Sequence, residues 1–99
     1  MNTSTTELHT AQAQRVTISE DALTVDLADG RTLTVPLAWF PRLQHGSPAE
    51  RNHYRLLGGG TGLHWPDLDE DLSVANLLAG KPAAESPASL QRWLASRKP

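Results

Sequence analysis

The densest group of ionisable side chains in the chain lies in the five residues from position 67 to position 71. Four of the five are carboxylates: Asp67, Asp69, Glu70 and Asp71. Carboxylates this close together can bind a hard cation, stabilise a helix N-terminus, or present an acidic patch to a partner. Because the spacing is not that of an EF-hand loop, a metal site is the least favoured. We expect first a structural role, in capping and in pairing with nearby arginines, and second a partner-facing acidic patch; the arginines are Arg42, Arg51 and Arg55.

The histidines could supply imidazole ligands or a general base. No two of them have the i, i+4 spacing of a helical zinc site; they are His9, His45, His53 and His64. The chain has no cysteine, which excludes a thiolate zinc site and a thiol nucleophile. His64 lies between Leu63 and Trp65 on a predicted strand, so we expect it to point to the opposite face and to hydrogen-bond locally.

A glycine-rich segment at residues 58–62 could bind a phosphate through backbone N–H groups. It lacks the Lys-Ser or Lys-Thr pair of a P-loop and the strand-to-helix context of a dinucleotide-binding turn, so we interpret it as a hairpin loop. No serine lies in a Gly-x-Ser-x-Gly elbow, and no third group completes a triad. The sequence therefore predicts no enzyme, no metal and no cofactor.

Aromatic and basic residues alternate in the middle of the chain, a pattern that can stack bases and bind phosphates. The candidates for this nucleic-acid role are Trp39, Arg42, Arg51 and Arg55. The aromatic residues are also the large side chains needed to cover a sheet, and the arginines have four nearby carboxylates to pair with. Core and ion-pair roles are therefore favoured, and nucleic-acid binding stays the alternative.

Three runs of alternating apolar and polar residues must form the scaffold that positions these groups. The apolar positions are Val16 and Ile18, then Leu23, Val25 and Leu27, then Leu33, Val35 and Leu37. Such alternation predicts a three-stranded antiparallel meander with one solvent-exposed face. A three-residue loop at 28–30, with Gly30 as a G1 bulge, sets Val25 opposite Leu33 and Leu23 opposite Val35. A four-residue loop at 19–22 sets Val16 opposite Val25, so all the apolar residues share one face.

Short helices and a further hairpin should cover that face. Large apolar residues follow the third strand: Trp39, Phe40 and Leu43. The segment 47–50 predicts a capping box, with Ser47 as N-cap, for a helix that runs to about Tyr54. Residues 55–57 and 63–65 predict a short hairpin. Ser73 is expected to cap a helix of one to two turns that stops at Gly80.

The chain ends in a separate helical segment. A linker rich in Pro and Ala, residues 81–86, finishes on a Ser-Pro pair that predicts the start of an amphipathic helix over residues 87–98. Its apolar residues fall at helical spacing: Leu90, Trp93 and Leu94. The helix either folds back on its own core or docks in a groove of a partner, with Trp93 as the buried anchor. The sequence leaves both open.

Length and composition predict one α+β domain at residues 15–80, preceded by a flexible tail at residues 1–14. Nine Lys and Arg residues against 11 Asp and Glu give a net charge of −2, which provides no global attraction to nucleic acid or anionic lipid. The first fifteen residues lack the features of a signal peptide, and no stretch approaches the roughly 20 apolar residues of a membrane span. Cytoplasmic localisation is expected.

Several short segments of the sequence resemble those of a family of small bacterial proteins known as domain of unknown function 2442. They are Asp29-Gly30-Arg31, the segment 35–43, Arg51, Gly60, His64-Trp65-Pro66 and the segment 69–74. The resemblance covers about half of the chain and implies a compact α+β domain without assigned catalytic residues. It also implies frequent occurrence beside a second small protein, in gene pairs proposed to be toxin–antitoxin systems. The last helix lies outside the shared block.

Two hypotheses of function follow. The first is a protein-binding module, the antitoxin-like member of such a pair, which masks a surface of a small protein encoded nearby. Its partner-binding residues would be Asp67, Asp69, Glu70, Asp71 and Trp93. The alternative is a nucleic-acid-binding or transcriptional autoregulatory protein that uses the four aromatic and basic candidates. Oligomeric state is not predicted.

Overall fold

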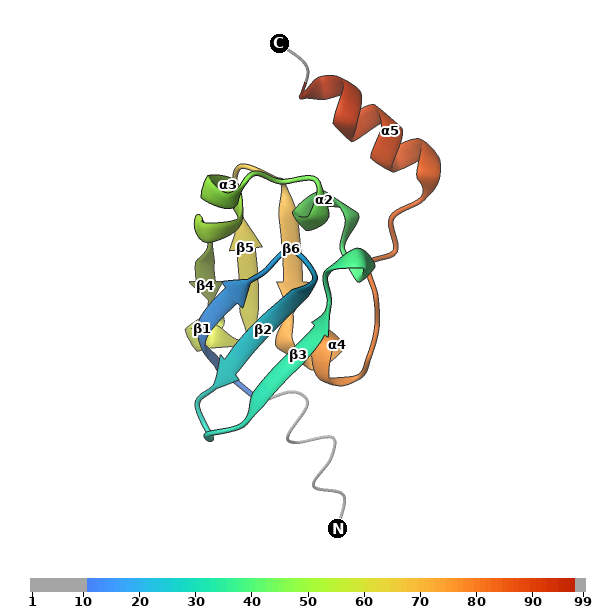
Figure 1. Ribbon diagram of the computed structural model, residues 1–99. Coiled ribbons are helices and arrows are strands. Elements are labelled where there is room, and N and C mark those ends of the chain that lie inside the picture. The colour runs from blue at the N-terminus through green and yellow to red at the C-terminus, as the bar shows by residue number, and fades with distance from the viewer. Residues whose placement is uncertain (1–10, 98–99) are drawn as a thin grey trace.

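Two three-stranded antiparallel sheets form the body of the computed structural model, which describes residues 11–97 (Figure 1). The first sheet, in order β1-β2-β3, contains Ala13–Ile18, Ala22–Leu27 and Thr32–Pro36. The second, in order β4-β5-β6, contains Arg55–Leu57, Gly62–Trp65 and Glu70–Ser73. With its short helices this is the predicted α+β class. Residues 1–10 of the expected tail and residue 98 of the expected last helix lie outside the described residues.

The first sheet has the predicted register. Val25 pairs with Val16 on one side and with Leu33 on the other, and Leu23 pairs with Val35. The turn after β2 is the predicted three-residue loop: Leu27 N–H donates to the Arg31 carbonyl at 2.8 Å, and Gly30 has a φ of 95°. A left-handed glycine at this position is what a G1 bulge requires. The apolar rows therefore face one side, as the alternation predicted.

Strand β1 begins earlier than the sequence indicated. Ala13 and Gln14, assigned above to the tail, belong to the strand, and Ala13 is buried. An irregularity of register between Ala13 and Arg15 lets Ala13 and Val16 both face the core. Gly60 packs so tightly here that a Cβ atom would lie 2.5 Å from the Ala13 carbonyl oxygen. The start of the first sheet is thus held against the loop between β4 and β5.

Strand β6 is the element that the sequence did not predict. The hairpin of β4 and β5 is as expected, but the chain then turns at residues 66–69 and pairs Glu70 with Trp65 and Asp71 with His64. Asp69 takes a φ of 50° in this turn, a conformation that Asp tolerates better than most residues. Two of the four clustered carboxylates therefore lie in a strand and not directly before a helix.

Short helices join the strands. They are η1 (Leu37–Trp39), α2 (Pro41–Gln44), α3 (Pro48–Asn52), η2 (Gly58–Gly60), α4 (Val74–Leu78) and α5 (Pro87–Ser96). The capping box predicted for α3 is present: Glu50 N–H donates to Ser47 Oγ, and Ser47 N–H donates to the Glu50 carboxylate. The helix ends at Asn52, two residues before the expected position. Ser73 caps α4 as predicted, and the left-handed Gly80 follows it.

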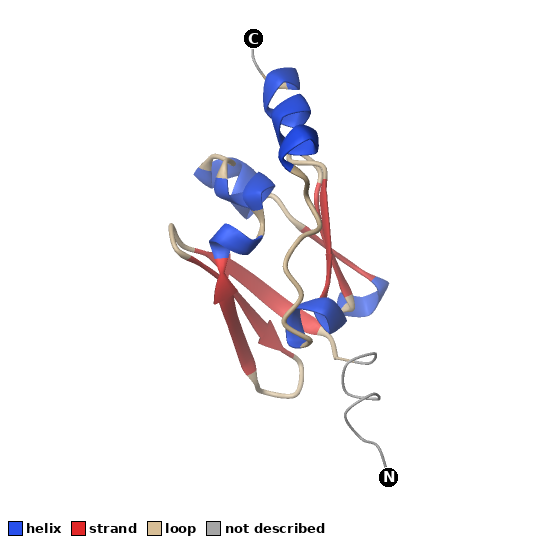
Figure 2. Ribbon diagram, turned by 90° about the vertical axis from the view of Figure 1, so that its right-hand side faces the viewer, coloured by secondary structure: helices blue, strands red, loops and turns tan. Residues whose placement is uncertain are grey.

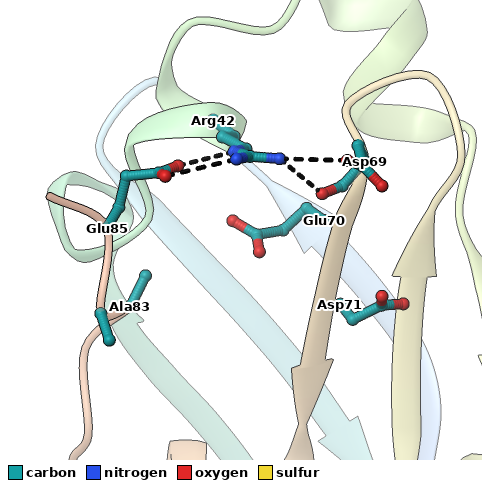
Figure 3. A pocket seen from close by; sticks show the side chains of 7 residues that line it. Arg42, Asp69, Glu70, Asp71, Ala83 and Glu85 are labelled. Carbon is teal, nitrogen blue, oxygen red and sulfur yellow. Dashed lines mark hydrogen bonds and ion pairs between the residues drawn. The ribbon is translucent and has the colours of Figure 1, made fainter. Parts of the chain in front are cut away.

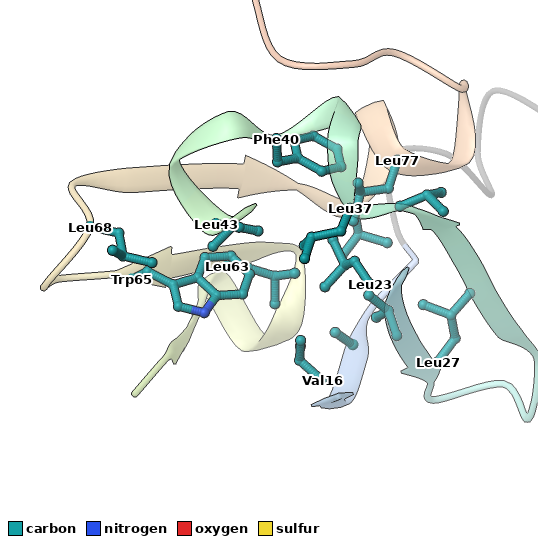
Figure 4. Close-up of a cluster of buried hydrophobic side chains, with 14 residues drawn as sticks. Val16, Leu23, Leu27, Leu37, Phe40, Leu43, Leu63, Trp65, Leu68 and Leu77 are labelled. Carbon is teal, nitrogen blue, oxygen red and sulfur yellow. The ribbon is translucent and has the colours of Figure 1, made fainter. Parts of the chain in front are cut away.

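The apolar faces of the two sheets enclose the core together with the short helices (Figure 4). Trp65 and Leu63 project from β5, Leu23 from β2, and Phe40 and Leu43 from the segment after β3; all are fully buried. Trp65 Nε1 donates to the Arg51 carbonyl at 2.9 Å, which satisfies its polar atom. Neither sheet could bury its apolar face alone, so the two stabilise one another. None of the helices between residues 11 and 97 has the length and apolar character needed to span a bilayer.

The linker and α5 extend beyond this body. Figure 2 shows the linker rising from α4 to α5 along the open side between the two sheets. Ala83 N–H donates to the Trp39 carbonyl at 3.0 Å, which fastens the linker to η1. Helix α5 projects past the ends of the sheets, and none of its residues is buried (Figure 1). The longest dimension of the molecule is accordingly 51 Å, against 25 and 24 Å for the other two.

Candidate functional site

The clustered carboxylates lie together at one edge of the second sheet. Asp67 and Asp69 belong to the turn between β5 and β6, and Glu70 and Asp71 to β6. The three aspartates have partners within the chain. His53 Nδ1 lies 2.7 Å from Asp67 Oδ2, and His64 Nδ1 lies 2.6 Å from Asp71 Oδ1.

Arg42 is the expected arginine that the structure brings to this segment. Its Nη1 atom donates to the Asp69 carbonyl at 2.9 Å and lies 3.4 Å from Asp69 Oδ2 (Figure 3). Its Nε and Nη2 atoms donate to Glu85 Oε1 and Oε2 at 2.6 and 3.3 Å. This bidentate contact raises the pKa of Arg42 and lowers that of Glu85. Arg42 thus ties the linker to the turn before β6.

Glu70 differs from the three aspartates. Its side chain is half-buried, and among the described residues no Lys, Arg or His nitrogen forms an ion pair with it. Burial is the main reason that its pKa rises to about 7, and the opposing effects of Arg42 and of the Asp71 backbone N–H are smaller. Figure 3 shows the carboxylate directed into the space between β6 and the linker.

That space is a groove made of two adjoining pockets. One has a volume of about 300 Å³ and lies beside Arg42 and Glu85, and the other, of about 340 Å³, extends to Phe40 and Leu77. The pockets share four lining residues, so they are continuous: Glu70, Asp71, Ala83 and Ala84. One wall is the strand β6 and the other is the linker. The first pocket is predominantly acidic, and the second also offers apolar residues.

Trp93, the predicted anchor, lies against its own chain and adjoins the acidic segment. Its ring is contacted by two guanidinium groups, with the Arg42 and Arg97 Cζ atoms 5.4 and 4.6 Å from the ring centroid. Arg97 also donates to the Glu50 carboxylate at 2.7 and 3.1 Å, which lowers the pKa of Glu50 to about 2. The side chain of Trp93 remains only half-buried. Helix α5 is therefore attached to the domain through Trp93 and Arg97 while much of its surface stays exposed.

The four candidates for nucleic-acid binding lie on four different elements. Trp39 is in η1, where its ring meets Phe40 edge to face. The Arg42 guanidinium is bonded as described, and Arg51 donates to the carbonyls of Leu43 and Gln44 at 2.8 and 2.6 Å. Arg55 is exposed on β4. Two of the three guanidinium groups are thus held by acceptors of the chain itself.

The other candidate groups take structural positions. His64 points to the opposite face from Leu63 and Trp65, as predicted, and its local hydrogen bond is the one to Asp71. The glycine-rich segment forms η2 and joins β4 to β5, with positive φ at Gly58, Gly59 and Gly60. Within residues 11–97 no three His, Asp or Glu side chains gather as metal ligands.

Three features were not predicted from the sequence. Glu85 was assigned to a linker, and its contact with Arg42 spans 43 positions, so no local pattern could indicate it. Leu56 and Leu57 lie on the edge strand β4 with 41% and 45% of their areas exposed, which the predicted hairpin did not indicate. The pairing of β6 was hidden because only Leu72 of its four residues is apolar.

One family model and two solved structures are similar to this chain. A family model described as "Protein of unknown function (DUF2442)" matches residues 13–83. A crystal structure of a protein of unknown function from Rhodospirillum rubrum is similar, with 32% identity and a TM-score of 0.64, over 79% of this chain and 94% of that one. A solution structure of an uncharacterised protein from Chromobacterium violaceum shares the fold, with 20% identity and a TM-score of 0.65, over 93% and 81% of the two chains. None of the curated proteins matches.

Proposed function

This chain belongs to the DUF2442 family of proteins of unknown function, and from that premise we propose that it is a protein-binding module. In this proposal it is the antitoxin-like member of a bacterial toxin–antitoxin pair. It acts in the cytoplasm and performs no catalysis. It neutralises a small basic protein encoded nearby by covering part of the partner's surface.

The observation that carries the proposal is the concentration of carboxylates around β6. Asp69 and Asp71 leave 84% and 71% of their side-chain areas exposed, even with their partners Arg42 and His64 in contact. Glu70 and Glu85 add two more carboxylates nearby, where β6 meets the linker, while the Asp71 carboxylate lies on the other face of β6 beside His64. A partner with a basic surface complements this face, and complementary charge favours both fast association and correct choice of partner.

Helix α5 supports the same proposal. It lies outside the matched residues 13–83, and its apolar residues Leu90 and Leu94 are only half-buried. Helices with such a face commonly dock in grooves of other proteins. The helix stands beside the acidic segment because Arg97 contacts both Glu50 and the Asp67 carbonyl. A partner that covers the acidic face can therefore contact α5 as well.

Recovery of the tagged full chain from its own host at low salt tests the proposal. We expect a stoichiometric small basic protein to co-purify, without nucleic acid. Asp71→Lys should weaken capture about tenfold or more, because it places a cation against a basic surface. Asp26→Lys is the matched control, since Asp26 also lies on a strand and pairs across it, with Arg15, but in the first sheet. This control should retain the partner.

Three outcomes would contradict the proposal: no captured protein, equal capture by Asp71→Lys, or nucleic acid in place of protein. The last would favour the alternative function through Trp39, Arg42, Arg51 and Arg55. In that case the affinity should fall steeply with salt concentration, by about one order of magnitude per phosphate contact for each tenfold increase in salt. Circular dichroism of both variants verifies that the fold is retained.

A further inference from the structure

The groove between β6 and the linker has the form of a binding site for a polypeptide. Building on the protein-binding function above, we propose that it binds one extended segment of the partner. The segment lies along β6 and directs a lysine or arginine side chain to Glu70. The partner thus contributes an extended chain that carries a basic residue beside an apolar one.

The backbone of β6 has one edge that is not paired with another strand of its sheet. Strand β6 pairs with β5 along one side and is the last strand of its sheet. In an antiparallel ladder, alternate residues direct their N–H and C=O groups away from the paired neighbour. The edge strand can therefore accept a further strand, and the groove provides room beside Glu70–Ser73. The linker forms the opposite wall, which would hold the added segment in place.

The charges around the groove favour a basic segment. Three acidic side chains beside the groove, Asp69, Glu70 and Glu85, stand against the two basic residues Arg42 and Lys81, whereas Asp71 lines it but directs its carboxylate to His64. Arg42 is already bonded to Glu85 and Asp69. A phosphate backbone or an acidic peptide would meet uncompensated like charge here. A basic segment would meet complementary charge.

Glu70 shows where the basic side chain belongs. Its carboxylate points into the groove, is partly removed from water and lacks an ion-pair partner among residues 11–97 (Figure 3). Burial without such a partner raises its pKa to about 7. A Lys or Arg side chain in the groove would supply the missing contact. The adjoining half, lined by Phe40, Leu72 and Leu77, accommodates an apolar neighbour of that residue.

The test is a nuclear magnetic resonance titration of the ¹⁵N-labelled full chain with a capped hexapeptide of alternating valine and lysine. We expect shifts confined to the amides of residues 70–73 and 83–85. The same peptide with glutamate in place of lysine should produce none. Glu70→Gln should weaken binding about fivefold or more, because it removes the charge that faces the lysine.

A second variant keeps the test informative without touching Glu70. Ala84→Trp fills the groove at a residue that lines both pockets, and it should abolish the shifts. Ala88→Trp, on the exposed surface of α5 outside the groove, is the matched control and should bind like the unmodified chain. Shifts elsewhere, no binding of the lysine peptide, or equal binding by Glu70→Gln and Ala84→Trp would overturn the proposal.

The experiments distinguish a wrong assignment of the groove from a wrong proposal of function. If the natural partner is captured equally by the unmodified chain, Glu70→Gln and Ala84→Trp, the groove assignment is wrong while the protein-binding function stands. If the lysine peptide binds in the groove but no protein is captured from the host, the proposed toxin–antitoxin role is wrong.

Discussion

Glu70 holds a carboxyl group where β6 meets the linker, and burial there raises its pKa to about 7. The groups facing it are Arg42 and Glu85 across the groove and Asp71 on its own strand. Because the pKa in the folded state exceeds the ordinary value of 4.5, the native state binds more protons than the unfolded state between these two values. The free energy of unfolding should therefore fall as the pH rises from about 4.5 to about 7 and then level off.

Glu70→Gln should remove this contribution. One pKa unit corresponds to about 1.4 kcal/mol, and solvent screening at a partly exposed carboxyl reduces the whole effect to about 1 kcal/mol. The variant should match the unmodified protein at pH 5 and be more stable at pH 8, as measured by urea denaturation at several pH values. Glu20→Gln, in the exposed turn after β1, controls for the loss of one carboxylate. A difference that is the same at every pH would refute this account of Glu70.

Individual side-chain contacts were predictable only where they are local. The capping box of α3 and the outward direction of His64 follow from spacing along the chain, and the structure contains both. The partners of the aspartates do not follow, because His64 meets Asp71 only when β6 pairs with β5. Of the arginines expected to pair with the carboxylates, Arg42 does so, whereas Arg51 donates to backbone carbonyls at the end of α2.

At the scale of elements, α5 lies against its own chain, which is one of the two arrangements that the sequence left open. Trp93 is held by Arg42 and Arg97, and Arg97 is bonded to Glu50. These contacts are few and lie near the surface, so the helix should open far more readily than the sheets. In the proposed function, a helix attached in this way stays on the domain when the chain is alone and is released to the partner.

Arg97→Ala should weaken this attachment. The variant loses the ion pair with Glu50 and one of the two cation–π contacts with Trp93, so the amides of α5 should exchange about three- to tenfold faster. Arg92→Ala is the matched control, because Arg92 lies on the same helix and is exposed. Exchange in β2 and β5 should be unchanged in both. Equal rates in α5 of the two variants would mean that Arg97 does not hold the helix.

Among the strands, the first sheet was predictable and the last strand was not. Alternation of apolar residues and one left-handed glycine specify the pairing of β2 with β1 and β3 almost uniquely. Strand β6 has no such alternation. Its acidic residues Glu70 and Asp71 are typical of a loop before a helix. It forms because Leu68, Leu72 and Val74 must reach the core from either side, which is a tertiary requirement.

At the scale of the whole molecule, the two sheets hold one core, and the groove lies where the linker passes their open side. The family match ends at residue 83, inside the linker, so it includes one wall of the groove and only part of the other. Glu85 and α5 lie beyond the match. The sheet that presents the carboxylates thus lies within the matched residues, while part of the segment that closes the groove lies outside them.

The most direct test of a partner-covered acidic groove is hydrogen–deuterium exchange of the full chain, alone and bound to the captured partner. We expect slower exchange on binding at residues 70–73 and 83–85. Exchange in β2, on the far sheet, should stay unchanged. Slowing confined to β4, or to the segments that carry Arg51 and Arg55, with unchanged exchange in β6, would contradict it.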